Sequence, residues 1–348
     1  MSHSTVPRSG AGAADEKDKP PVASGGATGP DDGAPSGPSG KLGLRLRFRR
    51  DRVLLLMTLP ALALVLLFNY VPILGNIVAF QDYDPYISDN GIVSMLHSPW
   101  VGLENFQRIF EDSAFWDAVT NTLVLFFLQL VLYFPIPILL ALLINSVVRP
   151  RVRAVSQAIL YLPHFFSWVL VIAVFQQLFG GAGILSQLLR QHGYDGLDIM
   201  TDPETFKYLI TAQSVWKDAG WGIIVFLAAL SSVPTDLYEA AAMDGAGRWR
   251  RMWHVTLPAL RPVIALLLVL RVGDALTVGF EQILLQRDSV GPGASEVLDT
   301  FVWWNGVRNQ DFGYAAAAGL VKGVVSLGLV LAANKVAHLM GEQGVYKK

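Results

Sequence analysis

The sequence predicts an all-α membrane protein with six transmembrane helices. Of its 348 residues, 52% are hydrophobic and only 16% are charged, and the mean hydropathy is +0.42. This composition is typical of a polytopic membrane protein rather than of a soluble domain. A transmembrane helix needs about 20 mostly apolar residues. Six stretches meet this requirement, at about 53–80, 119–147, 158–179, 208–231, 259–286 and 313–337.

The distribution of basic residues predicts the orientation of these spans. A basic run from Lys41 to Arg52 precedes the first span, and further basic residues lie in the loops at 149–153 and 248–251 and at the C-terminal end. The alternate loops carry only scattered basic residues, such as Arg108. Because Lys and Arg concentrate in cytoplasmic loops, we expect both termini to be cytoplasmic and the membrane lipid to surround the spans.

The chain divides by composition into three parts. Residues 1–40 are rich in Gly, Pro, Ser, Ala and Asp, and predict a disordered cytoplasmic tail. Residues 41–52 form a basic juxtamembrane segment, and residues 53–348 form the six-helix domain, which includes a polar loop at 232–258. The tail lacks the apolar region of a secretory signal.

Several function classes find no support in the sequence. The net charge is −1 and there is no cysteine, so nothing indicates nucleic-acid binding, a disulfide or a thiolate nucleophile. The six histidines are isolated, which gives no metal-ligand spacing. A phosphate-binding Gly-x-x-x-x-Gly-Lys-Ser/Thr loop is also lacking. We therefore expect no metal site, no catalytic residue and no cofactor, and no ATP hydrolysis by this chain itself.

The 232–258 loop is predicted to form two short helices at the membrane surface. Pro234 suits the first turn of a helix, and Gly245 suits its left-handed end. One face of the first helix is formed at helical spacing by Leu237, Ala240, Ala241 and Asp244. A second helix would present Trp249, Met252, Trp253 and Thr256 on one side. An amphipathic loop that only anchors its neighbours would show the same pattern.

The order and spacing of residues in this loop form a motif that is more specific than its amphipathic pattern. Glu239-Ala240-Ala241 is followed after three residues by Gly245, and after nine more by Val255-x-Leu257-Pro258. This resembles the EAA signature of the membrane subunits of ATP-binding-cassette (ABC) importers, in which the last element begins with Ile rather than Val. The resemblance implies that the loop docks into an ATPase subunit. The residues to which it assigns this coupling role are Glu239, Ala240, Ala241, Asp244, Gly245, Trp249, Leu257 and Pro258.

Further stretches resemble the maltose-type sugar permeases of binding-protein-dependent ABC importers. They are Val101–Phe106, Asn121–Leu123 and Ser231–Glu239; Tyr161–Trp168, Gly279–Gln282 and Met340–Glu342 resemble the branch that takes up oligosaccharides or polysaccharide fragments. The resemblance implies a type I importer fold in a bacterial cytoplasmic membrane. It also implies a heterodimer with a second permease, two ATPase subunits that bind the ATP, and an extracytoplasmic solute-binding protein.

Charged residues inside the spans are candidates for a substrate pathway, because buried charge at membrane depth is costly. The fifth predicted span holds Arg271, Asp274, Glu281 and Gln282, and the sixth holds Lys322. Arg271 and Asp274 are spaced to pair, and Asp274 and Glu281 to share a helix face. The resulting acid–base cluster would line a sugar pathway or would only lock the helices together.

Two functions of other classes stay open at this point. An ion-coupled secondary transporter would carry its proton on Asp274 or Glu281, and its uptake would depend on an ion gradient. A polytopic membrane enzyme would use the same acids with His164 and would be active without a partner. Neither explains the spaced motif in the 232–258 loop.

Overall fold

The structure is a computed structural model that describes residues 52–339. The predicted tail at 1–40, nearly all of the basic segment at 41–52 and the C-terminal residues 340–348 lie outside the described residues. The chain divides into two compact units, Met1–Ala63 and Leu64–Lys348. Helix α2 (Arg52–Val65) spans this division, and the remaining elements belong to the second unit.

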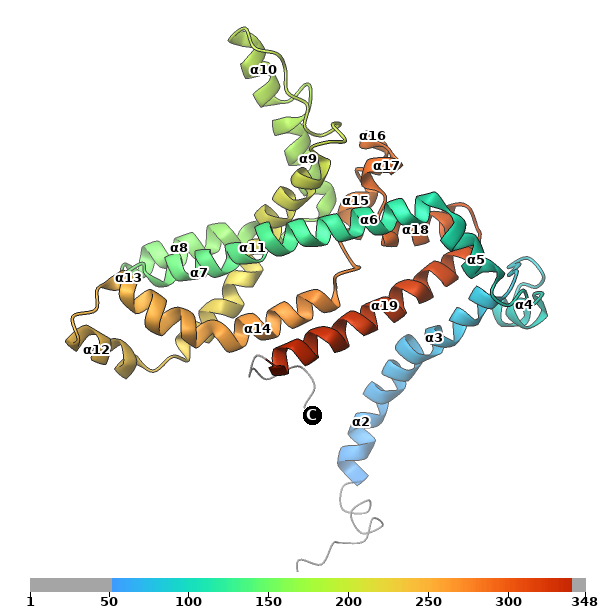
Figure 1. Ribbon diagram of the computed structural model, residues 1–348, viewed down its shortest axis with the longest axis horizontal. Coiled ribbons are helices and arrows are strands. Elements are labelled where there is room, and N and C mark those ends of the chain that lie inside the picture. The colour runs from blue at the N-terminus through green and yellow to red at the C-terminus, as the bar shows by residue number, and fades with distance from the viewer. Residues whose placement is uncertain (1–51, 340–348) are drawn as a thin grey trace, which may run out of the picture. The chain divides into compact units, whose positions relative to one another are not determined.

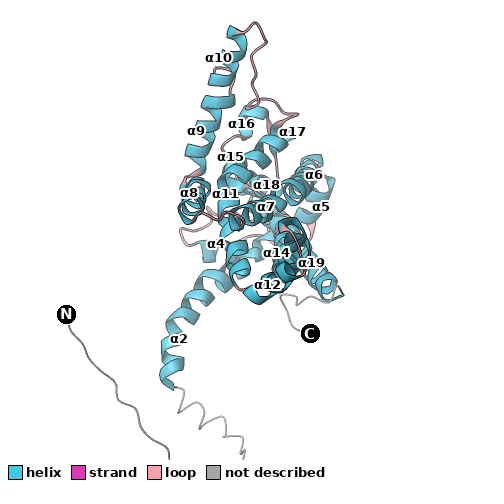
Figure 2. Ribbon diagram, turned by 90° about the vertical axis from the view of Figure 1, so that its left-hand side faces the viewer, coloured by secondary structure: helices cyan, strands magenta, loops and turns pink. Residues whose placement is uncertain are grey.

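The described residues form helices and loops without a β-strand, apart from an isolated antiparallel bridge between Gln81 and Trp100 (Figures 1 and 2). The α-helices of the second unit are α3 (Val71–Gly75), α4 (Gly91–His97), α5 (Glu104–Glu111), α6 (Ser113–Leu128), α7 (Pro135–Asn145), α8 (Pro150–Tyr161), α9 (Trp168–Phe179), α10 (Ile184–Gln191), α11 (Phe206–Ser231), α12 (Thr235–Met243), α13 (Arg248–Arg251), α14 (Leu257–Gly273), α15 (Phe280–Leu284), α16 (Arg287–Val290), α17 (Pro292–Ser295), α18 (Leu298–Trp303) and α19 (Phe312–Leu339). Short 3-10 or π-helical turns lie at Leu66–Tyr70, Asn76–Phe80, Gln129–Tyr133, Leu162–Phe165, Met252–Thr256 and Trp304–Arg308.

Six helical stretches within residues 52–339 are long and apolar enough to cross a membrane, which confirms the predicted fold class. They are Leu56–Phe80, Ser113–Asn145, Trp168–Gln191, Phe206–Ser231, Arg248–Gly273 and Phe312–Leu339. The fourth is the most buried within the chain, at 39% of its most apolar part. Helix α11 is therefore the span around which the other elements of the second unit pack.

Close packing along α11 depends on small residues. Ile223 and Phe226 of α11 pack with Ala141 of α7 in one apolar cluster, and Figure 1 shows the two helices side by side. A side chain added at Gly220 would lie 2.2 Å from the carbonyl oxygen of Leu160 at the end of α8. Gly220 thus lets α11 approach the chain where α8 ends. Helices α14 and α19 form a second neighbouring pair.

The third predicted span begins in the wrong place. Helix α8 ends at Tyr161, the chain passes through the turn Leu162–Phe165, and the apolar stretch begins again at Trp168. Pro163 contributes to the break, because proline lacks the N–H that would continue the hydrogen bonds of α8, and the backbone becomes extended at Phe166.

The fifth predicted span ends too late. The helix stops at Gly273 instead of continuing to about 286, and Asp274 becomes its C-cap residue. The backbone then turns at Gly279, whose φ of +56° is a left-handed conformation that glycine adopts at little cost. Apolar residues continue past this turn, and for this reason the sequence predicted a longer helix.

Candidate functional site

Helix α12 and the turn after it carry the EAA-like residues. Gly245 has a φ of +72°. Its amide donates to the Ala242 carbonyl at 3.0 Å, and the Ala246 amide donates to the Ala241 carbonyl at 2.9 Å. These two bonds are those of a Schellman helix end. The predicted left-handed glycine at the end of the first loop helix is confirmed.

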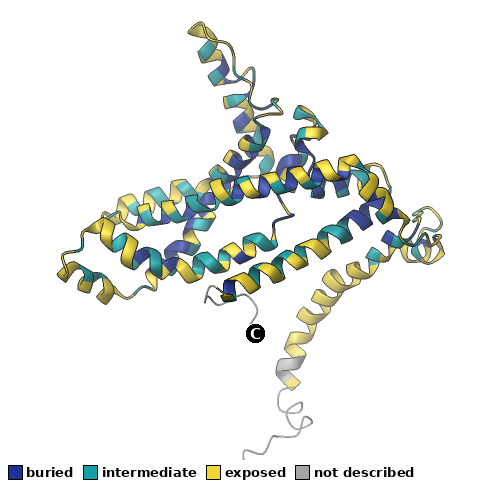
Figure 3. Ribbon diagram, in the orientation of Figure 1, coloured by how far each residue is buried: buried dark blue, intermediate teal, exposed yellow. Residues whose placement is uncertain are grey.

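The surface of this loop is uncovered. Helices α12 and α13 contain no buried residue, and Figure 3 shows α12 as mainly exposed. Its large apolar side chains are exposed to 51–89%: Leu237, Met243, Trp249 and Trp253. The hydroxyls of Tyr238 and Thr256 lie 3.2 Å apart and tie α12 to the start of the fifth span. The loop therefore has a defined shape and presents apolar area outward.

The structure brings the eight predicted coupling residues into one loop. Glu239, Ala240 and Ala241 lie on α12, Asp244 and Gly245 form its end, Trp249 lies on α13, and Leu257 and Pro258 begin α14. The sequence had suggested a second loop helix separate from the membrane helix. In the structure the two are not separate. The second loop helix continues through the turn Met252–Thr256 into α14, so that residues from Arg248 onward and the fifth span are one rod.

The predicted cluster of charges at membrane depth is arranged differently. Arg271 does not form a salt bridge with Asp274. Its guanidinium donates to the Gln129 amide oxygen and lies 5.8 Å from the Tyr133 ring centre. Asp274 is exposed at the end of α14. The predicted Arg271–Asp274 pair is wrong, because the Arg271 side chain reaches across to the Gln129–Tyr133 turn instead.

Glu281 and Gln282 lie on α15, beyond the turn at Gly279. The prediction that Asp274 and Glu281 share a helix face is therefore wrong. Glu281 is exposed, whereas Gln282 is fully buried. The Gln282 amide donates to the Ile210 carbonyl at 2.9 Å and to the Gln213 amide oxygen at 2.8 Å, which fixes α15 on α11.

Lys322, in the sixth span, forms its ion pair with Asp299 of α18 rather than with Asp274. Both side chains are largely buried, at 16% and 21% exposure. The second carboxylate oxygen of Asp299 is buried without a hydrogen-bond partner. Lys322, one of the five predicted pathway residues, thus links α19 to α18 through this ion pair.

Sequence reasoning missed two adjacent charges in the middle of α11. Lys217 is 8% exposed, and its ammonium donates to the carbonyls of His164 and Phe166 at 2.8 and 2.7 Å. These carbonyls belong to the break caused by Pro163, and backbone at membrane depth needs such partners. The signal was available, since Lys217 and Asp218 interrupt an otherwise apolar run.

Asp218 extends this arrangement into a chain of polar contacts. The His164 Nδ1 lies 2.9 Å from the Asp218 carboxylate, and the His164 ring stacks on Trp221 with 5.1 Å between ring centres. The Tyr133 hydroxyl lies 3.4 Å from the Asp218 carbonyl oxygen. We call Arg271, Gln129, Tyr133, Asp218, His164, Lys217 and Trp221 the polar seam. Guanidinium, amide, carboxylate and aromatic groups of this kind bind sugars.

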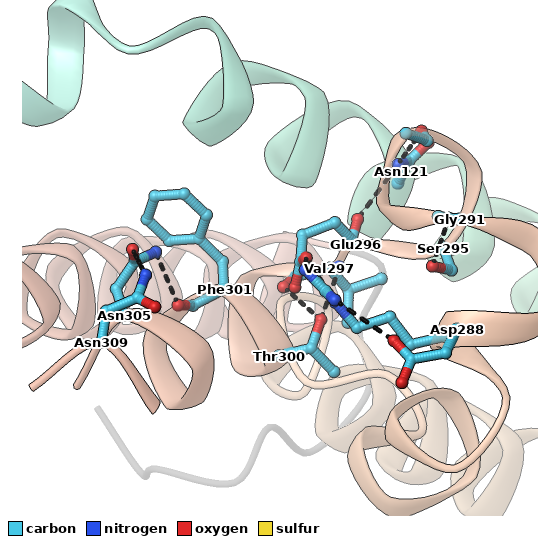
Figure 4. Close-up of polar contacts among 12 residues, drawn as sticks. Asn121, Asp288, Gly291, Ser295, Glu296, Val297, Thr300, Phe301, Asn305 and Asn309 are labelled. Atoms are coloured by element: carbon cyan, nitrogen blue, oxygen red, sulfur yellow. Dashed lines mark hydrogen bonds and ion pairs between the residues drawn. The ribbon is translucent and has the colours of Figure 1, made fainter. Parts of the chain in front are cut away.

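The 274–311 segment between the fifth and sixth spans is folded onto the helices. Arg287 and Glu296 form an ion pair at 2.5 Å with 8% and 7% exposure, and the guanidinium lies 3.8 Å from the Trp304 ring centre. Asn121 of α6 donates to the Glu296 carbonyl at 3.0 Å (Figure 4). This segment is thus part of the packed protein.

Comparison with known proteins places the chain among transport permeases. The permease protein YteP of the polygalacturonan/rhamnogalacturonan transport system of Bacillus subtilis (strain 168) is 42% identical, over 87% of this chain and 93% of YteP. The protein LplB of the same organism is 39% identical, over 86% of this chain and 92% of LplB.

A solved structure gives the same result. A bacterial alginate ABC transporter, in complex with an alginate pentasaccharide-bound periplasmic protein, contains a chain that superposes with a TM-score of 0.78 and 36% identity. The match covers 87% of this chain and 99% of that one. The family described as binding-protein-dependent transport system inner membrane component matches residues 133–339. The chain belongs to this family and is a multi-pass permease of the ABC importer type.

Proposed function

We propose that this chain and a second, related permease form the path by which an oligosaccharide crosses the bacterial cytoplasmic membrane. The names of its relatives support a carbohydrate cargo, since they include a polygalacturonan/rhamnogalacturonan permease and an alginate transporter. The polar seam supports it too, because its groups suit hydroxyls and ring faces. Glu281, Asp274 and Lys322 lie apart from the seam's contacts and are proposed as secondary pathway contacts.

We also propose that the 232–258 loop couples this path to two ATPase subunits, which bind and hydrolyse the ATP. The observation that carries this proposal is the spaced signature on an uncovered helix that ends at a left-handed glycine. Because the loop continues from Arg248 into α14 without a break, and α12 is tied to Thr256 through Tyr238, a displacement of the loop would move the fifth span with it. Such a rod suits alternating access driven by closure of an ATPase dimer.

The proposal sets the topology of the assembly. The loop faces the cytoplasm, as do both termini, and the 274–311 segment faces the other side. An extracytoplasmic solute-binding protein would deliver the sugar there, in keeping with the periplasmic protein bound to the structural neighbour. The alternating basic loops of the sequence support this orientation.

The test is co-purification of the ATPase with the tagged permease from its native membrane. We expect Glu239→Ala and Gly245→Asp to lose most of the ATPase and its ATP hydrolysis while membrane insertion is kept. Gly193→Asp is the matched control, because Gly193 is also left-handed, with a φ of +80°, and has open space around it in a different loop.

Equal recovery of the ATPase with all three variants would overturn the coupling role of the loop. Uptake that then follows an ion gradient and ignores ATP would favour a secondary transporter. Activity of the purified chain without any partner would favour a membrane enzyme.

A further inference from the structure

Arg271 differs from the other cations at membrane depth. Lys217 lies 3.9 Å from the Asp218 carboxylate, and Lys322 pairs with Asp299. Arg271 forms no salt bridge with any carboxylate of residues 52–339, although Asp274 lies only three residues away. Its partners, Gln129 and Tyr133, are both neutral. The positive charge therefore lacks a compensating negative charge within the described protein.

The guanidinium is held in place but is not saturated. Gln129 is 3% exposed and accepts from one terminal nitrogen, while the Tyr133 ring lies against the group. The Arg271 Nε is buried without a hydrogen-bond acceptor. A guanidinium has five N–H donors in a rigid planar fork that matches a carboxylate. A cation that is oriented, uncompensated and short of acceptors at membrane depth is suited to a passing anion.

We propose that Arg271 is the contact for the carboxylate of an acidic sugar, such as a uronate unit of the transported oligosaccharide. This inference rests on the proposed function and names the class of substrate. A carboxylate would compensate the charge and would accept from the terminal N–H groups of the guanidinium, for which Gln129 is the one acceptor among the described residues. Gln129 and Tyr133 act as positioning residues that keep the guanidinium in the path.

The rest of the polar seam suits the uncharged part of the same sugar unit. The Trp221 side chain is 57% exposed and offers a ring face, and His164 and Asp218 have about a third of their side chains exposed, at 33% and 32%. The negative charge of Asp218 is offset by Lys217 at 3.9 Å, so that it does not oppose a carboxylate near Arg271. The seam thus combines one site for a carboxylate with neighbouring sites for hydroxyls.

The test measures binding to the complete transporter in nanodiscs of phosphatidylcholine, which has no net negative charge. The probes are trigalacturonate and the same trisaccharide with its carboxylates reduced to alcohols, titrated by saturation-transfer NMR. We expect the wild type to prefer trigalacturonate by about tenfold or more, the size of one charge-assisted contact. Rising salt concentration should weaken this preference.

Arg271→Met should abolish the preference, because it weakens binding of trigalacturonate far more than binding of the reduced trisaccharide, whereas Arg271→Lys should keep part of it. Arg261→Met is the control, since Arg261 is an exposed arginine of the same helix. Equal binding of the two probes by the wild type, or an unchanged preference in Arg271→Met, overturns the proposal. ATPase co-purification is unaffected by either result, so a failure here is distinct from a failure of the coupling loop.

Discussion

Two segments that connect neighbouring spans use their side chains in opposite ways. In the 232–258 loop, α12 and α13 have no buried residue, and Trp249 is 73% exposed. In the 274–311 segment, even charged residues are buried, and Arg287 and Glu296 are 8% and 7% exposed. The first segment leaves its apolar groups without partners in the chain, as a docking surface does. The second pairs its buried charges within the chain, Arg287 with Glu296 and Asp299 with Lys322, and belongs to the permease's own core.

The largest expected effect on stability comes from breaking the buried Arg287–Glu296 ion pair. Arg287→Met would leave the Glu296 carboxylate buried without its cation and would also remove the contact with the Trp304 ring. We expect a loss of about 3–5 kcal/mol in the free energy of unfolding, because an uncompensated buried charge is strongly destabilising. Denaturant titration of the purified permease in detergent measures this loss.

The control exchanges the pair as a whole. Arg287→Met/Glu296→Met should recover most of the stability, because no charge is then left buried. Trp249→Ala in the other loop should change the unfolding free energy by less than about 0.5 kcal/mol, as for an exposed side chain without special contacts. If Trp249→Ala destabilised the isolated permease as much as Arg287→Met, the contrast between the two segments would be lost.

The sequence was sufficient to predict the fold class, the presence of six spans and the left-handed glycine that ends the first helix of the 232–258 loop. Apolar runs of membrane length are local signals, and so is the glycine that ends α12. The same logic applied to Lys217 and Asp218 would have located the polar seam, since both interrupt an apolar run.

The pairing of the charges could not be predicted in the same way. Arg271 contacts Gln129, which is 142 residues away in the sequence, and Lys322 of α19 pairs with Asp299 of the neighbouring helix α18. Helical spacing suggested Asp274 as the partner of Arg271, but spacing holds only while the helix continues, and α14 ends at Gly273. The contacts between side chains of different helices depend on how the helices pack, which cannot be predicted from local sequence spacing.

A smaller effect tests whether the docking loop is preorganised. Gly245→Ala would place a side chain on a residue with a φ of +72°, which costs about 1–2 kcal/mol for an L-residue. Gly247→Ala is the matched control, because Gly247 has a φ of −67° and equally open space around it. Hydrogen exchange at the end of α12 should become faster in Gly245→Ala and stay unchanged in Gly247→Ala. Equal exchange in the two variants would mean that the glycine turn does not hold the helix end.

The smallest expected effect tests whether burial or ion pairing itself stabilises the 274–311 segment. Arg108 and Asp311 also form an ion pair at 2.7 Å, but their side chains are 49% and 35% exposed. The hydrogen bond to Asp311 raises the pKa of Arg108 above its ordinary value, so the pair keeps its cation at neutral pH. Arg108→Gln should cost less than about 1 kcal/mol of unfolding free energy, and less still at high salt.

Arg308→Gln is the control for this last variant, because it removes the same charge from an exposed arginine for which the described residues provide no ion pair. The difference between the two variants is then the contribution of the contacts of Arg108 with Asp311, Asn105 and the Tyr314 ring. A cost for Arg108→Gln as large as that for Arg287→Met would show that ion pairing itself stabilises this side of the permease. A small cost would mean that the 274–311 segment is held by burial, because only a charge removed from water requires its partner.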